Sequence, residues 1–226
     1  MKLSIIIPVY NEEKTIEEVV KKVKKHWKNR EIIIVDDNSQ DKSSQIIKKL
    51  TSKDVKAFFH KKNQGKGAAI RTGVKHATAD VVIIQDADME YDPEDYHKLL
   101  APIEKGKADV VYGSRFTGEH RNLLFWNMVG NKLLNLLCNI LYNTTLSDME
   151  TGYKVFKTEI LKDNLWDANS FDFEPEITAR ILKKKIYIYE VPISYTGRDY
   201  TQGKKITIKD AFIAVWTLLK FRVISV

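Results

Sequence analysis

The stretch Val81-Val82-Ile83-Ile84-Gln85-Asp86-Ala87-Asp88 joins a short run of β-branched residues to two carboxylates. Such a run predicts a buried strand. Because alternate side chains of an extended segment point the same way, Asp86 and Asp88 are expected to converge where the strand ends. Two like charges ~4 Å apart repel by roughly 4 kcal/mol near a protein surface. A divalent cation held with a substrate phosphate would reverse this repulsion; the simpler alternative is a polar strand exit with two solvated acids.

On either side of this stretch, the first half of the chain alternates between two hydrophobic periods. Strands are expected over 3–9, 31–35, 55–59, 80–85 and 108–113. Helices are expected between them, the first with Asn11 as its N-cap and the others over about 43–50, 66–76 and 94–104. Strands that alternate with helices predict βαβ units with right-handed crossovers. The predicted fold class is therefore α/β, with a Rossmann-like, mostly parallel central sheet flanked by helices.

Polar clusters follow four of the predicted strands. Ligands of parallel sheets bind outside the carboxyl ends of the strands, so these clusters are expected on one rim. They are Tyr10-Asn11-Glu12, Asp36-Asp37-Asn38, Asp86-Ala87-Asp88 and Ser114-Arg115. For Asp36-Asp37 the alternative is a helix cap. The glycines of Asn63–Gly67 serve either a tight turn or an anion at the following helix start.

The second half of the chain is less regular. Helices are expected over 123–142, 175–184 and 208–222, and strands over 152–156 and 186–191. The first of these helices carries asparagines at every fourth position, a polar stripe that argues against a membrane span. No Pro-, Gly- or Ser-rich linker interrupts the chain, so a single domain over 1–226 is predicted.

The composition bounds the classes of partner. The 226 residues carry a net charge of +7, with a pI near 9.2. This balance suits nucleic acid, an anionic membrane surface or phosphorylated substrates. A single cysteine, Cys138, excludes an internal disulfide and agrees with a reducing compartment. No secretory signal is evident, and a cytoplasmic location is expected.

Seven short motifs occur in an order that resembles one known family. They are Ser4–Glu12 (SIIIPVYNE), Val35–Ser39 (VDDNS), Asn63–Gly67 (NQGKG), Asp86–Asp88, Gly113–Arg115 (GSR), Asp148–Tyr153 (DMETGY) and Glu190–Tyr195 (EVPISY). The chain resembles the family-2 glycosyltransferases, which have the GT-A fold. Among them it is similar to dolichyl-phosphate mannose synthases and bacterial polyprenyl-phosphate glycosyltransferases. The resemblance covers nearly the whole chain.

The resemblance implies an inverting transfer of a hexose from GDP-mannose or UDP-glucose to dolichyl or undecaprenyl phosphate, with Mg²⁺ or Mn²⁺. Residues 1–115 would bind nucleotide sugar and metal, and residues 116–226 the acceptor. Asp86 and Asp88 would hold the metal, with Glu90 as the third residue on the metal side, at a position where relatives often have Gln. Arg115 would bind the acceptor phosphate. The donor would be contacted by Pro8, Tyr10, Glu12, Val35, Asp37, Gln64, Lys66, Arg198 and Lys204.

Other activities stay open at this stage. Transfer to a saccharide hydroxyl would need a general base, for which Asp148 or Glu150 is the candidate. A sugar-nucleotide pyrophosphorylase would also use nucleotides and paired acids. A dehydrogenase is disfavoured because no G-x-G-x-x-G follows the first strand. A nucleic-acid binder would leave the acids on the rim unexplained.

The last helix bears an apolar stripe, and Lys209, Lys220 and Arg222 flank it. The stripe contains Ile208, Ala211, Phe212, Val215, Leu219 and Val223. Such a helix either lies in a membrane interface or packs on the sheet. The prediction is peripheral attachment to the inner face of a membrane, where a separate membrane protein is a possible partner.

Overall fold

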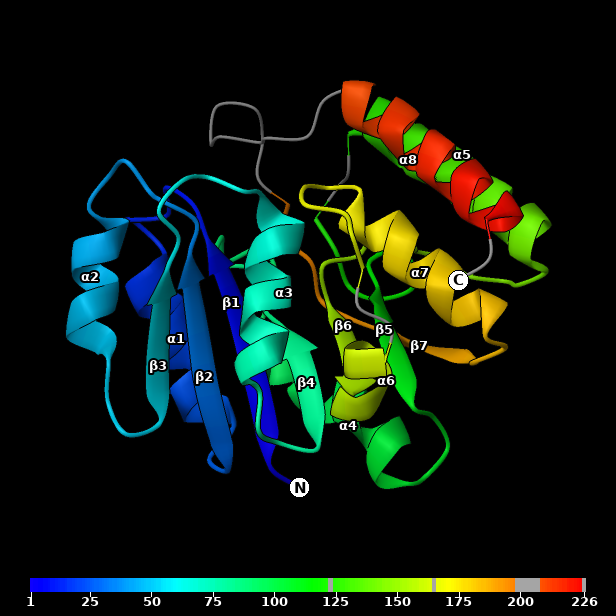
Figure 1. Cartoon of the computed structure of the whole chain (residues 1–226). Helices are drawn as coiled ribbons and strands as arrows, with labels where there is room; N and C mark the ends of the chain where they lie inside the picture. Colours follow the sequence, from blue (N-terminus) through cyan, green and yellow to red (C-terminus); the bar gives the residue numbers. More distant parts are fainter. Residues whose placement is uncertain (122–123, 164–165, 198–207, 225–226) are drawn as a thin grey trace.

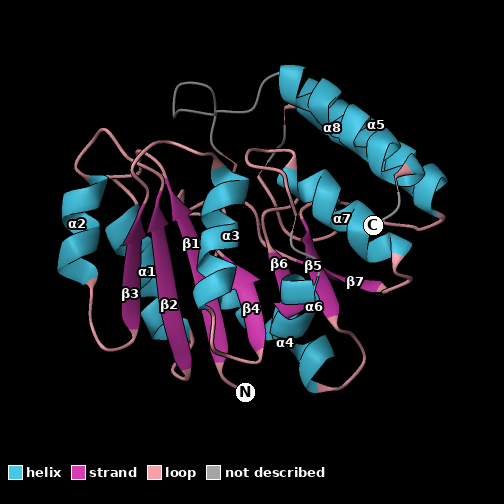
Figure 2. Cartoon of the chain, in the orientation of Figure 1, coloured by secondary structure: helices cyan, strands magenta, loops and turns pink. Residues whose placement is uncertain are grey.

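A seven-stranded sheet in the order β3-β2-β1-β4-β6-β5-β7 organises the structure, a computed structural model that describes residues 1–121, 124–163, 166–197 and 208–224 (Figures 1 and 2). Arg198 and Lys204 lie outside the described residues. The strands are β1 (Leu3–Val9), β2 (Arg30–Asp36), β3 (Val55–Phe59), β4 (Val81–Ile84), β5 (Val110–Ser114), β6 (Lys154–Lys157) and β7 (Ile188–Pro192).

The sheet is mostly parallel, as predicted. β1 pairs in parallel with β2 and β4, β2 with β3, and β5 with β7. β6 runs antiparallel to both of its neighbours, β4 and β5. Its first residue therefore lies at the carboxyl ends of these two strands. The residues just before β6 are thereby delivered to the rim where ligands of such sheets bind.

Two helical layers cover the two faces of the sheet. Alternate residues of each strand point to opposite faces, so Ile5 and Ile7 of β1 belong to one core and Ile6 to the other. The first core is covered by α1 (Ile16–His26), α2 (Ser43–Leu50) and α4 (Tyr96–Glu104). The second is covered by α3 (Lys66–His76), α6 (Thr158–Asp163) and α7 (Phe173–Lys183).

Two further helices, α5 (Phe125–Tyr142) and α8 (Ile208–Val223), lie side by side over α7 (Figure 1). They share a small core that includes Cys138 of α5 with Leu218 and Phe221 of α8. The Tyr142 hydroxyl donates to the Leu218 carbonyl at 2.8 Å and ties the pair together. The predicted amphipathic helices of the second half are therefore present. Within the described residues, no helix has the length and apolarity needed to cross a membrane.

The start of the first helix differs from the prediction. α1 begins at Ile16, and Asn11 has a left-handed backbone with φ 55°. The Asn11 side chain accepts from the Gln40 backbone N–H at 2.8 Å, and the Asn11 backbone N–H donates to the Ser39 hydroxyl at 3.0 Å. The predicted N-cap role of Asn11 is therefore wrong, because the residue instead joins the loop after β1 to the loop after β2.

Candidate active site at the carboxyl rim of the sheet

An ion triad occupies the end of β4. Lys66, the first residue of α3, places its Nζ 2.9 Å from Asp86 Oδ1 and 3.0 Å from Glu174 Oε1. Glu174 comes from the first turn of α7. Burial alone would lower the pKa of the Lys66 ammonium, but the Asp86 and Glu174 carboxylates outweigh it and raise that pKa well above its usual value. Asp86 therefore already binds a cation, supplied by the protein itself.

The position of Asp86 depends on a glycine in the loop before β6. A Cβ at Gly152 would overlap Asp86 Oδ2. The Gly152 backbone N–H donates to the Tyr91 hydroxyl at 2.8 Å. The side chain of Gln85, the residue before Asp86, donates to the Asp86 backbone carbonyl and accepts from the Tyr153 hydroxyl at 2.6 Å. Gly152 is thus explained by close packing against this carboxylate, and Tyr153 by its hydrogen bond to Gln85, the residue before Asp86.

The predicted metal ligands do not assemble as a group of three. Among the described residues, no three His, Cys, Asp or Glu side chains are placed to hold a metal ion together. Glu90 Oε2 accepts from the Tyr195 hydroxyl at 2.7 Å, and Met89, the residue before it, has a left-handed backbone with φ 66°. Asp86 and Asp88 remain as hard oxygen ligands, which fit Mg²⁺ or Mn²⁺ when a substrate diphosphate completes the coordination.

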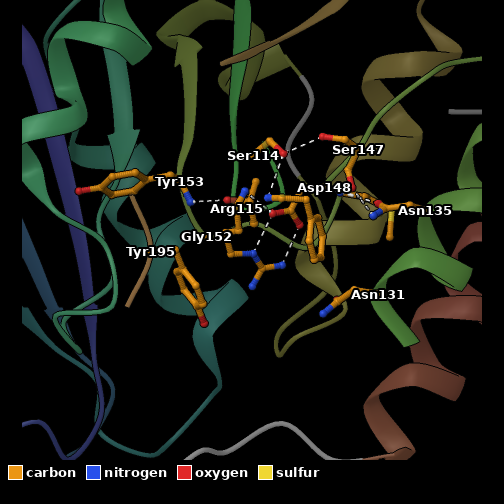
Figure 3. A network of polar contacts seen from close by, with 12 residues as sticks. Ser114, Arg115, Asn131, Asn135, Ser147, Asp148, Gly152, Tyr153 and Tyr195 are labelled. Carbon is orange, nitrogen blue, oxygen red and sulfur yellow. Dashed lines mark hydrogen bonds and ion pairs between the residues drawn. The ribbon is translucent and has the colours of Figure 1, made fainter. Parts of the chain in front are cut away.

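A second ion pair lies on the same rim (Figure 3). Arg115 follows β5, and Asp148 lies in the loop before β6. Asp148 Oδ2 accepts from the Arg115 backbone N–H at 2.9 Å and from its Nε at 2.8 Å, while Oδ1 accepts from Nη2 at 2.7 Å. Asp148 is 0% exposed. Its contacts differ from those of a general base, because both oxygens are engaged by the arginine and a buried carboxylate needs such a partner.

Two members of the asparagine stripe of α5 hold the loop that carries Asp148. Asn135 donates to the Ser147 carbonyl at 2.6 Å and accepts from the Met149 N–H at 2.7 Å. Asn139 donates to the Leu146 carbonyl and accepts from the Leu146 N–H, both at 2.9 Å. Amide side chains provide one donor and one acceptor together, which suits them to clamp a backbone. The four-residue spacing places both clamps on one helical face.

Asp37 orders the turn that precedes α3. Its carboxylate accepts from the backbone N–H groups of Gln64 at 2.9 Å and Gly65 at 2.6 Å, and it lies 2.7 Å from His60 Nδ1. Gly65 has φ 95°, and a Cβ there would collide with the Asn169 carbonyl. The glycine is required both by its conformation and by this close approach. Asp37 therefore sets the position of Lys66 through the turn.

The other predicted donor residues also lie at or beyond strand ends. Pro8 is in β1, and Tyr10 and Glu12 follow it. Glu12 is 9% exposed, and its Oε2 accepts from the Thr15 hydroxyl at 3.1 Å. The side chain of Val35 in β2 is 0% exposed and belongs to the core, so a contact of Val35 with the donor would have to come from its backbone.

Three charged residues were not predicted as a group: Lys154 and Glu174, which are buried, and Glu150, which is half-buried. Burial, together with the Glu174 carboxylate, raises the pKa of Glu150 to about 8. Burial lowers the pKa of Lys154 to about 8, and its ammonium donates to the carbonyls of Met149 and Thr151. The sequence gives little signal for Glu174, because acids are common in the first turn of any helix.

The sheet with one antiparallel insertion, and the acid site at its carboxyl rim, define the GT-A class of glycosyltransferases. The chain belongs to glycosyl transferase family 2, whose family model matches residues 4–165. It is an enzyme of this family, and the fold expected from the sequence motifs is confirmed.

Curated relatives and solved structures extend the comparison. A UDP-N-acetylglucosamine–dolichyl-phosphate N-acetylglucosaminyltransferase of Methanococcus voltae is 31% identical over 239 residues, covering 96% of this chain and 95% of its own. A dolichol-phosphate mannosyltransferase of Pyrococcus furiosus is 29% identical over 232 residues, covering 98% and 64%. The crystal structure of glucosyl-3-phosphoglycerate synthase from Mycobacterium tuberculosis with Mn²⁺ and UDP has a TM-score of 0.77 at 18% identity, covering 99% and 81%.

Proposed function

We propose that this enzyme transfers a sugar from a nucleotide sugar to the phosphate of a polyprenyl phosphate, with a divalent cation at Asp86 and Asp88. The donor class is a hexose or N-acetylhexosamine nucleotide, with GDP-mannose, UDP-glucose and UDP-N-acetylglucosamine as candidates. The names of the relatives from Methanococcus voltae and Pyrococcus furiosus, both of which specify a dolichyl- or dolichol-phosphate, support this class of acceptor.

The observation that carries the proposal is the Arg115–Asp148 pair. A saccharide hydroxyl would have to lose its proton to a general base during attack. Of the two candidate bases, Asp148 is fully buried and both of its oxygens accept from Arg115, so it is poorly placed for that role. Glu150, with its pKa raised to about 8, is largely protonated near neutral pH and lacks the charged form that a base needs. A phosphate acceptor is already ionised near neutral pH and needs charge neutralisation instead. Asp148 engages the Nε and Nη2 atoms of Arg115, so the Nη1 edge of the guanidinium is the one that would contact the proposed acceptor phosphate.

The donor would lie across the ends of β1, β2 and β4. Tyr10, Glu12 and the turn held by Asp37 and Gln64 would border the nucleoside, and Lys66 would lie beside the diphosphate. A divalent cation at Asp86 and Asp88 would offset the charge that develops on the departing nucleoside diphosphate. Arg198 and Lys204, predicted to contact the donor, remain predictions because they lie outside the described residues. Inversion at the anomeric carbon follows from a single direct displacement.

The α5–α8 surface would place this site against a membrane. We define this surface by the exposed apolar residues of the two helices. In α8, Phe212 is 73%, Trp216 67% and Val223 85% exposed, at helical spacing along one side. Lys209, Lys220 and Arg222 are exposed on the same helix, which favours an anionic interface. The surface further contains Phe125, Trp126, Leu133, Leu136 and Ile140 of α5 and Ile213 and Leu219 of α8.

A transfer assay tests the proposed function. Purified enzyme with Mn²⁺ is given each of the three nucleotide sugars in turn, with dolichyl phosphate, undecaprenyl phosphate, dephosphorylated polyprenol or a free saccharide as acceptor. The expected product is a polyprenyl phosphate sugar from one donor, with no product from the polyprenol. Product from the saccharide would instead identify the hydroxyl-acceptor enzyme. A separate mixture of nucleoside triphosphate and sugar phosphate tests the pyrophosphorylase, which would release pyrophosphate from it.

A further inference from the structure

Lys66 is shared between carboxylates from two separate elements of the fold. Its Nζ lies at nearly equal distances, 2.9 Å and 3.0 Å, from Asp86 after β4 and Glu174 in α7. Only Asp86 belongs to the predicted metal site. When a cation binds there, Asp86 would exchange Lys66 for the cation, whereas Glu174 would stay paired with Lys66. We propose that Glu174 is a positioning residue: when a divalent cation displaces the Lys66 ammonium from Asp86, Glu174 keeps that ammonium in place. This inference rests on the proposed metal-dependent function.

Glu174 has the capacity to retain the ammonium. Its side chain is 5% exposed, and its Oε2 is buried without a hydrogen-bond partner among the described residues, while Oε1 accepts Lys66. A buried carboxylate oxygen without a donor is costly, and a second hydrogen bond from Lys66 would satisfy it. An ammonium displaced from Asp86 must keep an anionic partner, because an unpaired buried charge costs several kcal/mol. Glu174 is the partner that Lys66 already contacts.

The backbone geometry restricts where Lys66 can go. Gly65 and Gly67, on either side of it, press against the carbonyls of Asn169 and Ala168, and the Ala68 N–H donates to the Asn169 carbonyl at 3.1 Å. The segment that contains Asn169 leads directly into α7, which carries Glu174. Lys66 and Glu174 therefore belong to two segments that pack directly against each other, the start of α3 and the segment that leads into α7. Exchange of the cation at Asp86 requires a side-chain movement of Lys66, and the ammonium then stays beside the proposed diphosphate site.

Mn²⁺ binding without nucleotide tests this role, with electron paramagnetic resonance titration of the wild type, Lys66→Gln, Glu174→Gln and the double variant. Lys66→Gln removes the competitor and is expected to tighten Mn²⁺ binding about tenfold. In Glu174→Gln, Asp86 is the one remaining carboxylate partner of the pair for Lys66, so Mn²⁺ binding is expected to weaken about tenfold. In the Lys66→Gln background, Glu174→Gln is expected to change the affinity by less than about twofold. Glu159→Gln, an exposed acid of α6, is the control for charge.

Three outcomes would overturn the inference. One is an equal loss of Mn²⁺ affinity from Glu174→Gln in both backgrounds, which would mean that Glu174 acts by its charge alone. Another is Mn²⁺ affinity that Lys66→Gln leaves unchanged. The third concerns Glu174→Asp, which keeps the charge but shortens the reach and serves if Glu174→Gln does not fold: unchanged affinity in this variant contradicts retention. Because no sugar is present, failure here is distinct from failure of the proposed transfer, which the acceptor assay reports separately.

Discussion

Arg115 and Asp148 are 33 positions apart in the chain, yet three hydrogen bonds join them at the rim of the sheet. Their meeting depends on the direction of β6, which brings the loop before it to the carboxyl end of β5. The carboxylate is fully buried and the guanidinium side chain is 11% exposed. The pair therefore fixes the direction in which the arginine faces the proposed acceptor.

Breaking this pair is expected to affect both stability and acceptor binding. Asp148→Asn should lower the free energy of unfolding by about 3 kcal/mol, because it leaves a buried guanidinium without its anion. It should also raise the KM for polyprenyl phosphate more than the KM for the donor. Urea unfolding and steady-state kinetics measure the two effects. The matched control is Asp109→Asn in the exposed ion pair with Lys157, where a loss of less than about 1 kcal/mol is expected. Equal losses in both variants would contradict the prediction.

Metal dependence is expected to follow Asp88 and not Glu90. Asp88→Ala should reduce transfer about a hundredfold or more at saturating donor, because charge on the leaving diphosphate loses its compensation. Glu90→Gln should keep the same Mn²⁺ dependence, since Glu90 is bonded to Tyr195. Rates measured across a series of Mn²⁺ concentrations, after treatment with a chelator, separate the two variants. A Glu90→Gln enzyme that needs far more Mn²⁺ would restore Glu90 as a ligand.

Glu150 is expected to make stability depend on pH. Its pKa is about 8 in the folded protein and near 4.5 when exposed. Between these values the folded protein holds a proton that the unfolded chain has released, so stability falls as the pH rises from about 5 to 8. The pKa of Lys154 is lowered from 10.5 to about 8, so Lys154 affects the free energy of unfolding only above pH 8, where stability rises with pH. Urea unfolding at several pH values should show a decline that Glu150→Gln flattens; an unchanged slope would disprove the assignment.

The α5–α8 surface is expected to bind anionic vesicles. Replacing Phe212 and Trp216 by serine removes two large exposed apolar side chains and should weaken binding at least tenfold. Co-sedimentation with phosphatidylglycerol-containing liposomes at low salt measures the affinity. Tyr187→Ser, which removes an aromatic residue 89% exposed outside both helices, is the control. Wild-type protein that stays in the supernatant would rule out this surface as an interfacial one.

The two glycines Gly152 and Gly130 are expected to respond oppositely to a methyl group. Gly152→Ala pushes against Asp86 and should weaken both Mn²⁺ binding and transfer. A Cβ at Gly130, within α5, meets nothing within 4 Å. Gly130→Ala should therefore stabilise the protein by up to about 1 kcal/mol through helix propensity, with activity retained. Thermal unfolding and Mn²⁺ titration of both variants check the pair; full Mn²⁺ affinity in Gly152→Ala would contradict the packing.

Local patterns were sufficient to predict the parallel half of the sheet and the rim acids. The run before Asp86 and the alternation of periods indicate β1 to β5 and the helices between them. The direction of β6 was not predictable, because a short apolar run is the same for either direction of pairing. The motifs therefore indicated Arg115 and Asp148 separately but not their contact. Glu174 was missed for a similar reason, since its partner Lys66 is distant in sequence and only the approach of the first turns of α3 and α7 brings them together.

The reversal of β6 also bears on how such enzymes diversify. A strand that enters the sheet from the rim leaves the residues ahead of it outside the β-ladder. In this chain, those residues run from Asn143 to Tyr153, and side chains of α5 clamp part of them. If Arg115 binds the acceptor as proposed, exchange of that segment is expected to alter acceptor recognition while the register of β4, β6 and β5 stays intact. A change of acceptor would then need only a short loop, without a new arrangement of strands.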